Sequence, residues 1–359
     1  MDVNQERLVN SFIKLVQIDS ESGDEKKITE YLKKELASLG FKVIQDKIGN
    51  LIASNGPEPL MALCAHVDTV KPGKGIKPIV TKDGEIKTNG DTILGADDKS
   101  GVASILEILH TLKENGKSID LEIVFTVQEE LGLIGSTALD FSLLKSKRAI
   151  NLDAGPEDIL IGEPSIMHFD IEIIGKAAHS GIHPEQGINV VEIAVEAIKN
   201  LKWGRIDDET TSNLGQINAG IAINIVPERA TLLAEIRSRN LKTFDRYCKE
   251  LVGEFNKAAK KFGGKVAIKA IQRTRAYIVS ENDPLVKSVA WAIQKNGITP
   301  EIKPTGGATD ANNFNSHGIV AITTGSCGES CHSKRESIKV TGLTLGAQIV
   351  MDAILSLKK

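Results

Sequence analysis

The sequence contains few cysteines and no excess of charge of either sign. Four cysteines occur in 359 residues, too few for a disulfide-stabilised scaffold, so we expect a cytoplasmic protein with reduced thiols. The 44 basic and 47 acidic residues give a formal net charge of -3, and like charges do not gather in long runs. Composition therefore predicts neither a nucleic-acid partner nor a membrane partner.

Several other signals are also absent. Residues 1–7 lack a basic stretch followed by an apolar segment, which argues against a signal peptide. Apolar runs fall short of the ~20 residues that span a bilayer. A Gly-x-Gly-x-x-Gly pattern does not follow any predicted strand, and Lys99-Ser100 lacks the glycine spacing of a phosphate-binding loop. A nucleotide-dependent α/β enzyme is therefore the least favoured class.

The length predicts two domains, because single hydrophobic cores usually divide beyond about 250–300 residues. Strands alternate with helices in residues 1–165 and again in 276–359, which predicts an α/β domain with a mostly parallel central sheet. Residues 166–275 read instead as a strand-helix-strand-helix-strand insert, a smaller α+β, ferredoxin-like domain. Sites in open parallel sheets form at the carboxyl ends of the strands.

The expected elements follow from apolar periodicity. Helices are expected at residues 8–16, 28–36, 100–112, 188–201, 243–262, 285–295 and 343–357. Strands are expected at 42–45, 51–54, 60–65, 121–127, 149–152, 168–174, 230–238, 266–271 and 319–323.

Residues able to bind metal follow several of these strands. His66-x-Asp68 comes after the apolar run 60–65, where an imidazole can bind zinc and a carboxylate can accept a hydrogen bond from its other ring nitrogen. Asp97 lies in Gly-Ala-Asp-Asp-Lys-Ser-Gly before a helix. This segment reads either as an acidic turn that caps the helix or as a carboxylate shared by two cations.

The remaining candidates lie farther along the chain. Glu129 and Glu130 follow the strand 121–127; because neighbouring residues point to opposite sides of extended backbone, one can bind metal while the other handles a proton. Asp153 follows the end of another strand, and His332 supplies an imidazole near the end of the sequence. The alternative for Cys-x-x-x-Cys-His, ending at His332, is a structural zinc cluster, but a second cysteine pair is missing.

Together, two imidazoles and three carboxylates form a set that suits two zinc ions. Each ion receives three protein ligands if Asp97 is shared, and each keeps a position for water or substrate, as catalytic zinc does. Three carboxylates against two divalent cations leave a formal charge of +1, which favours a bound hydroxide. The five candidates are His66, Asp97, Glu130, Asp153 and His332.

At these five segments, in order along essentially the whole chain, the sequence resembles the cocatalytic zinc exopeptidases, which include peptidase T, glutamate carboxypeptidase and aminoacylase. It is most similar to peptidase T, a tripeptide aminopeptidase, and its shorter relatives. The resemblance implies that His66 and Asp153 bind one zinc, Glu130 and His332 the other, and Asp97 both. It implies the same family fold, a cis peptide at Asp97-Asp98, Glu129 as general base, and Asp68 as the partner of His66.

The inserted segment also matches this family. His179, in Gly-Lys-Ala-Ala-His-Ser-Gly, resembles the histidine that stabilises the oxyanion, often across a dimer; without the resemblance it would read as a turn histidine. Arg237 is similar to the arginine that holds a substrate carboxylate, a bidentate task that suits a guanidinium. Asn224 matches a substrate-contacting position. The resemblance thus implies a lid and a homodimer formed through the inserted domain.

The predicted function is hydrolysis of the N-terminal peptide bond of small peptides by a metal-bridging hydroxide. Two Zn²⁺ per chain are expected, with Co²⁺ or Mn²⁺ as substitutes. One alternative is another amide hydrolase of the same family, either a carboxypeptidase or an N-acylamino-acid hydrolase. An alternative of another class is a non-catalytic metal- or peptide-binding protein. The chain is shorter than peptidase T, and the loop Thr305–Asp310 lacks the arginine that precedes it there, so peptide length is left open.

Overall fold

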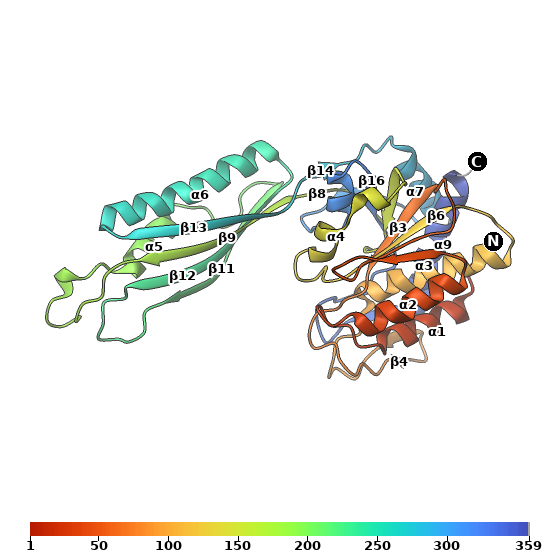
Figure 1. The fold of residues 1–359 in the computed structure, drawn as a ribbon, viewed down its shortest axis with the longest axis horizontal. Coiled ribbons are helices and arrows are strands. Elements are labelled where there is room, and N and C mark those ends of the chain that lie inside the picture. Colours follow the sequence, from red (N-terminus) through yellow and green to blue (C-terminus); the bar gives the residue numbers. More distant parts are fainter. Residues whose placement is uncertain (358–359) are drawn as a thin grey trace. The chain divides into compact units, whose positions relative to one another are not determined.

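The structure is a computed structural model and describes residues 1–357. These residues form two compact units. Unit 1 comprises Met1–Gly162 and the chain from Ile278 onward, and unit 2 comprises Glu163–Tyr277. Both ends of the described chain belong to unit 1 (Figure 1).

Unit 1 is built around a nine-stranded mixed sheet with the strand order β1-β2-β6-β3-β7-β16-β8-β14, and β15 also pairs with β8. The strands are β1 (Lys42–Gln45), β2 (Leu51–Ser54), β3 (Met61–His66), β6 (Leu121–Thr126), β7 (Arg148–Asn151), β8 (Asp158–Glu163), β14 (Tyr277–Ile278), β15 (Glu301–Pro304) and β16 (Val320–Thr323). The helices are α1 (Gln5–Val16), α2 (Lys26–Ser38), α3 (Ala96–Glu114), α4 (Ile134–Ala138), α7 (Pro284–Lys295), α8 (Ala311–Ser316) and α9 (Val340–Leu357).

The centre of this sheet is parallel and its β1 edge is antiparallel. β3 pairs in parallel with β6 and β7, and β7 with β16, whereas β1 pairs antiparallel with β2, and β2 with β6. Every residue of β3 and β6 is buried, as expected for strands covered on both faces. This arrangement confirms the predicted α/β class, and the antiparallel pairs, which also include β16 with β8, make the sheet mixed.

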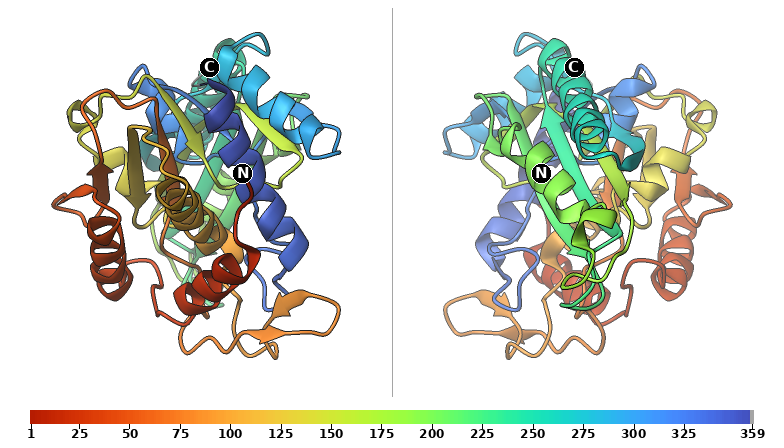
Figure 2. Two further views of the ribbon diagram at one scale, coloured as in Figure 1. Left: turned by 90° about the vertical axis from the view of Figure 1, so that its right-hand side faces the viewer. Right: turned by 90° about the vertical axis from the view of Figure 1, so that its left-hand side faces the viewer.

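The last helix of unit 1 is unusually apolar. By length and composition α9 could cross a membrane, but half of that stretch is buried inside the protein. It packs against α1, α3 and α7, and Figure 2 (left) shows it in blue within the helices of unit 1. The burial of Leu343, Ile349 and Ile354 accounts for much of the apolar composition, because the face of a helix that packs into a core is apolar.

Unit 2 is an antiparallel sheet with two helices on one face. Its elements are β9 (Ser165–Ile174), α5 (Val190–Lys199), β10 (Gly204–Arg205), β11 (Thr210–Ala219), β12 (Arg229–Ser238), α6 (Leu241–Phe262) and β13 (Lys265–Thr274). The strand order is β10-β11-β12-β9-β13. Leaving out the short β10, this is the β-α-β-β-α-β succession of ferredoxin-like folds. Figure 2 (right) shows α5 and α6 in front of the strands.

Burial alternates along β12 because only one face of its sheet is covered. Leu232, Ala234 and Ile236 are buried in the core that α5 and α6 close, while Leu233 is exposed and Glu235 and Arg237 are partly exposed. This is the period-two pattern expected of an antiparallel sheet with one solvated face.

Several elements were not predicted, among them β8, β15, α4 and α8, and the physical reason is plain for two other parts of the fold. β11 was missed because its sequence, TTSNLGQINA, is polar and mostly exposed, so it offers no hydrophobic alternation; its place is fixed by pairing with β12. A small sheet of β17 (Ser337–Lys339), β5 (Glu85–Lys87) and β4 (Ile79–Val80) was missed because strands of two or three residues carry too short a pattern.

Candidate metal centre

Three neighbouring parallel strands bring the predicted ligands of unit 1 to one edge of the sheet. In the register of β3 with β6, His66 lies beside Thr126, so Glu129 and Glu130 follow within four residues. The backbone N–H of Leu152, at the end of β7, donates to the carbonyl of Cys64 at 2.8 Å, which places Asp153 beside the end of β3. The carboxyl ends of the strands thus form the site, as expected for an open parallel sheet.

Asp97 lies at the centre of the site. Its Oδ1 is 2.9 Å from Nε2 of His66, and its Oδ2 is 3.1 Å from Nε2 of His332. Nε2 of His332 also lies 2.9 Å from Oε2 of Glu130. The peptide Asp97-Asp98 is cis, as the resemblance implies. The two oxygens of Asp97 therefore face two different imidazoles.

Two groups of metal-ligating side chains share Asp97. In each group the ligand atoms lie within 4.8 Å of one another. The groups are His66, Asp97 and Asp153, and Asp97, Glu130 and His332. The structure thus brings together all five residues that the sequence singled out as metal ligands.

The residues present fit a pair of divalent cations. Oε1 of Glu130 is buried and has no hydrogen-bond partner within the described chain, as expected for an atom reserved for a ligand. Imidazole nitrogens and carboxylate oxygens are donors that zinc accepts. Each group offers three protein ligands, so a cation in either group would keep a position for water or substrate.

The pKa values of the site residues are shifted because several carboxyl groups lie close together. Burial raises the pKa of Asp153 well above its usual value, and the nearby carboxylate of Asp97 adds to this shift. Burial also opposes ionisation of Asp97, but hydrogen bonds from His332 and His66 outweigh it and lower the pKa of that carboxyl. The same contact with Asp97, together with Glu130, raises the pKa of His332 to about 11. In the absence of cations, protons on the imidazoles compensate the carboxylates.

Asp68 contacts both the imidazole of His66 and the backbone of the two glutamates. Nδ1 of His66 lies 3.0 Å from the carbonyl oxygen of Asp68 and 3.5 Å from its carboxylate. The same carboxylate accepts the backbone N–H groups of Glu129 and Glu130 at 2.9 and 3.2 Å, and the hydroxyl of Ser22 at 2.6 Å. Asp68 therefore fixes the imidazole and the strand end that carries the candidate base, an outer contact typical of metal-binding histidines.

Glu129 points its carboxyl group into the same crowded region. Burial raises its pKa well above the usual value; His66 opposes the shift, while Asp153 and Glu130 add to it. A carboxyl group of raised proton affinity suits the exchange of a proton with a reacting molecule.

Glu336 is a contributor that the sequence did not reveal. This buried carboxylate accepts the backbone N–H groups of Leu94, Gly95 and Asp97 at 2.8, 2.7 and 3.0 Å. Three backbone hydrogen bonds donated to this one carboxylate fix the turn that presents Asp97. The only sequence signal is position, because Glu336 follows His332 by four residues and so links the two segments that meet in the site.

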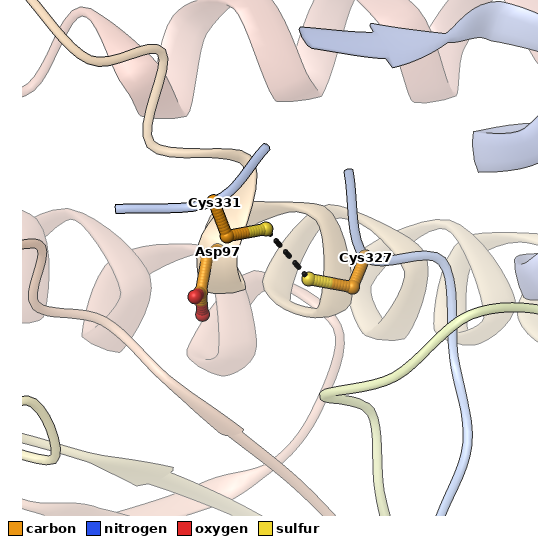
Figure 3. A group of neighbouring side chains, drawn as sticks. All are labelled: Asp97, Cys327 and Cys331. Carbon is orange, nitrogen blue, oxygen red and sulfur yellow. Dashed lines mark hydrogen bonds between the residues drawn. The ribbon is translucent and has the colours of Figure 1, made fainter. Parts of the chain in front are cut away.

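Two thiols lie beside this centre. Sγ of Cys327 and Sγ of Cys331 are 3.4 Å apart, and Figure 3 shows them facing each other next to Asp97. With a carboxylate oxygen of Asp97, the sulfur atoms form a third group within 4.8 Å. Within residues 1–357 this group offers three ligand atoms, and one of them is shared with both other groups. A structural zinc cluster, the alternative that the Cys-x-x-x-Cys-His spacing left open, needs four ligands, so it does not form here.

The predicted substrate-binding residues of unit 2 lie in different surroundings. His179 and Asn224 are exposed, and their segments are paired, since the N–H of Ser180 donates to the carbonyl of Asn224 at 3.1 Å. Arg237 lies on the open face of the sheet, where its Nε and Nη2 each donate to Glu235 at 3.1 Å.

Arg237 and His179 lie at opposite ends of unit 2. β12 begins at Arg229, which pairs with Ile174 near the His179 segment, and Arg237 pairs with Ile166 at the start of β9. Eight residues of strand separate Arg229 from Arg237, about 26 Å at about 3.3 Å per residue. A small peptide therefore cannot reach both Arg237 and His179 of one chain.

The fold and the paired ligand groups define a metal-dependent hydrolase. The model of "Peptidase family M20/M25/M40" matches residues 62–356, and the chain belongs to this family. The predicted resemblance is thereby confirmed.

Two solved structures and one curated relative are similar over nearly the whole chain. A tripeptidase from Staphylococcus aureus is 33% identical with a TM-score of 0.96, covering 100% of both chains. The aminopeptidase PepT from Bacillus cereus is 36% identical with a TM-score of 0.91, covering 99% of this chain and 100% of that one. Carboxypeptidase G2 from Pseudomonas sp. is 30% identical over 97% of this chain and 89% of its own.

Proposed function

We propose that this peptidase binds two zinc ions and removes the N-terminal residue from small peptides such as tripeptides. The observation that carries the proposal is the position of Asp97, whose two carboxylate oxygens lie 2.9 and 3.1 Å from separate imidazoles. A carboxylate placed between two ligand groups suits a bridging role in a two-metal hydrolase. The similarity to a tripeptidase and an aminopeptidase over whole chains supports the substrate class.

His66 and Asp153 would hold one ion, Glu130 and His332 the other, and Asp97 both. When bound, the ions would supply Lewis acidity toward the scissile carbonyl and lower the pKa of a water molecule. Co²⁺ or Mn²⁺ would suit the same donors.

The chain's own residues would carry the proton. Glu129 would accept a proton from the attacking water at its carboxylate and deliver that proton to the nitrogen of the leaving amine. Asp68 would hold the imidazole of His66 and the backbone of Glu129 in place throughout. This division leaves Glu130 to bind metal and Glu129 to handle the proton.

Unit 2 would bind the rest of the substrate. Arg237 would hold the terminal carboxylate, in exchange for part of its pairing with Glu235, and Asn224 would donate to the peptide backbone. The separation of about 26 Å along β12 supports a homodimer in which His179 stabilises the oxyanion in the site of the partner chain. The thiols of all four cysteines are free, which supports a cytoplasmic location.

A second candidate is another amide hydrolase that uses the same metal centre. The similarity to a carboxypeptidase at 30% identity over 97% of this chain favours hydrolysis at the carboxyl-terminal side of the substrate. Such an enzyme would require a free carboxylate near the scissile bond but no free α-amino group.

One experiment separates these functions. Metal content per chain is measured alongside hydrolysis of a panel of free dipeptides, tripeptides and N-acylated amino acids, before and after chelation. We expect two metal ions per chain and release of the N-terminal residue from free tripeptides, lost on chelation and restored by zinc. Preferential cleavage of N-acylated substrates would favour the carboxypeptidase-type alternative, and one metal ion per chain at full activity would refute the two-zinc site.

A further inference from the structure

Cys327 and Cys331 lie close enough to react with each other. Their sulfur atoms are 3.4 Å apart, and the thiol of Cys331 lies 3.3 Å from the carbonyl oxygen of Gly328. Both residues are partly exposed and both are free cysteines. Figure 3 shows the two side chains reaching toward each other from two stretches of the same loop. A disulfide requires a sulfur–sulfur distance of about 2.05 Å, so a shift of little more than 1 Å would close the bond.

We propose that this pair is a reversible thiol-oxidation site whose reactant is a low-molecular-weight disulfide. In the first step, the sulfur of one cysteine attacks that disulfide, loses its proton, and releases one small thiol to leave a mixed disulfide. The second cysteine then attacks the bonded protein sulfur and releases the other small thiol. In sum, two S–H bonds of the protein break, one Sγ–Sγ bond forms, and the small disulfide takes up two electrons and two protons.

The position of the pair connects this chemistry to the metal centre. The backbone of Cys327 is anchored, since its N–H donates to the carbonyl of Ala154 at 2.9 Å, so we expect the larger backbone movement at Cys331. The next residue is His332, whose Nε2 lies 2.9 Å from Glu130 and 3.1 Å from Asp97. A movement of about 1 Å is large compared with the tolerance of metal coordination, about ±0.2 Å. Oxidation would therefore weaken cation binding by Asp97, Glu130 and His332, a consequence that rests on the proposed function.

The other use of two neighbouring thiols is to bind a soft metal ion. The described residues argue against it, because the third atom available to the sulfur pair is an oxygen of Asp97. Both oxygens of that carboxylate already face imidazoles. A thiolate site would thus compete with both predicted zinc sites, whereas a disulfide requires nothing of Asp97.

The test uses the full-length protein, reduced and then equilibrated with mixtures of oxidised and reduced glutathione. The three residues between the cysteines, Gly328, Glu329 and Ser330, are not trypsin sites, so both cysteines remain in one tryptic peptide. We expect this peptide to become about 2 Da lighter and to resist alkylation, with full reversal by a reducing agent. Zinc bound per chain, measured on the same samples, is expected to fall from two equivalents toward one.

Three variants make the outcome specific. Cys327→Ser and Cys331→Ser, each compared with its own reduced form, should retain their zinc in oxidising mixtures. Cys248→Ser, which removes a thiol of unit 2, should respond as the unsubstituted protein does. The proposal fails if no intrachain disulfide forms at any glutathione ratio, or if the disulfide forms without a change in bound zinc. It also fails if the thiols resist oxidation only while the two sulfur atoms hold a metal ion. Because mass and zinc are the readouts, a protein that hydrolyses no peptide would refute the proposed function and leave this test intact.

Discussion

The two units present their candidate functional residues in opposite ways. In unit 1 the side chains meet at strand ends, with His66 buried and Asp97 within hydrogen-bonding distance of two imidazoles. In unit 2, His179 and Asn224 are exposed, and the side chain of Arg237, 33% exposed, is paired with Glu235. Unit 1 therefore holds a preformed site, whereas the residues of unit 2 have no shared target within their own unit.

The difference follows from what each set of residues has to bind. Cations require several donors at fixed short distances, so their ligands must converge before binding. Residues that bind the ends of a peptide are instead spaced by the length of the substrate, or are supplied by another chain. The comparison predicts that substitutions in unit 1 affect catalysis and metal binding with every substrate. The effect of substitutions in unit 2 on activity should instead depend on the substrate and on whether the chains assemble.

The largest effect is expected at Glu129. Glu129→Gln should lower kcat by about 10²- to 10⁴-fold, the range for loss of a general base, because an amide cannot accept the proton of the attacking water. Zinc content measured with the kinetics should remain at two equivalents, since Glu129 is not one of the proposed ligands.

The neighbouring residue provides the matched control. Glu130→Gln should lose zinc from the group of Asp97, Glu130 and His332, and its activity should recover partly when excess zinc is added. Activity of Glu129→Gln near that of the unsubstituted enzyme would assign the proton transfer to another group.

The next prediction tests whether unit 2 acts in the partner's site. Chains carrying His179→Ala and chains carrying Glu129→Gln should each be nearly inactive alone. If His179 acts across a dimer, mixed dimers contain one site with both residues intact, and an equal mixture should regain about one quarter of normal activity. The measurement is the hydrolysis rate after the two proteins are unfolded together and refolded.

The mixing experiment can also fail informatively. A mixture no more active than its components would place His179 in the site of its own chain. Arg237 and His179 could then not both contact one small peptide in the way proposed, because of their separation along β12. The unsubstituted enzyme, taken through the same refolding, controls for losses in handling.

The sequence predicted most of unit 1 because its signals are local. The buried run of β3 and the helical period of α3 each determine an element by themselves, and polar residues directly after strands reveal the site edge. Glu336 could not be recognised in this way, because its role depends on three backbone N–H groups more than 230 residues earlier. A surface glutamate and a buried one have the same appearance in a sequence.

Unit 2 was less predictable for a related reason. The strand β11 has no apolar period of its own, and its position depends on pairing with β12. The pairing of Arg237 with Glu235 joins alternate residues of one strand, a spacing that is equally compatible with two solvated side chains. In both cases the tertiary context decided what the local pattern left open.

A smaller effect is expected at Glu336. Glu336→Ala should weaken zinc binding by about 10- to 100-fold, the range for outer contacts of metal sites, because the turn that presents Asp97 loses its acceptor. Competition with a chromophoric chelator would measure the affinity. Glu329→Ala is the matched control, since this residue lies on the same segment but is largely exposed. Equal affinities of the two variants would show that the turn holds Asp97 without Glu336.

The smallest effect concerns the stability of unit 2. His168 and Arg237 lower the pKa of Glu235 to about 2, against the opposing effect of burial. A carboxyl group whose pKa is lower in the folded state stabilises the fold at pH values above its unfolded pKa, about 4.3, and loses this contribution as the pH falls toward 2.

Glu235→Gln should therefore reduce the free energy of unfolding at pH 7 by about 1 kcal/mol or less, as for partly exposed ion pairs. The difference from the unsubstituted protein should shrink between pH 4 and pH 2. Urea unfolding followed by hydrogen exchange in α6 and β12 would measure it within unit 2, with zinc present or absent. A difference that stays constant with pH would mean that Glu235 acts through packing alone. The comparison would then change, because Arg237 would be free to bind a substrate carboxylate without first giving up an ion pair.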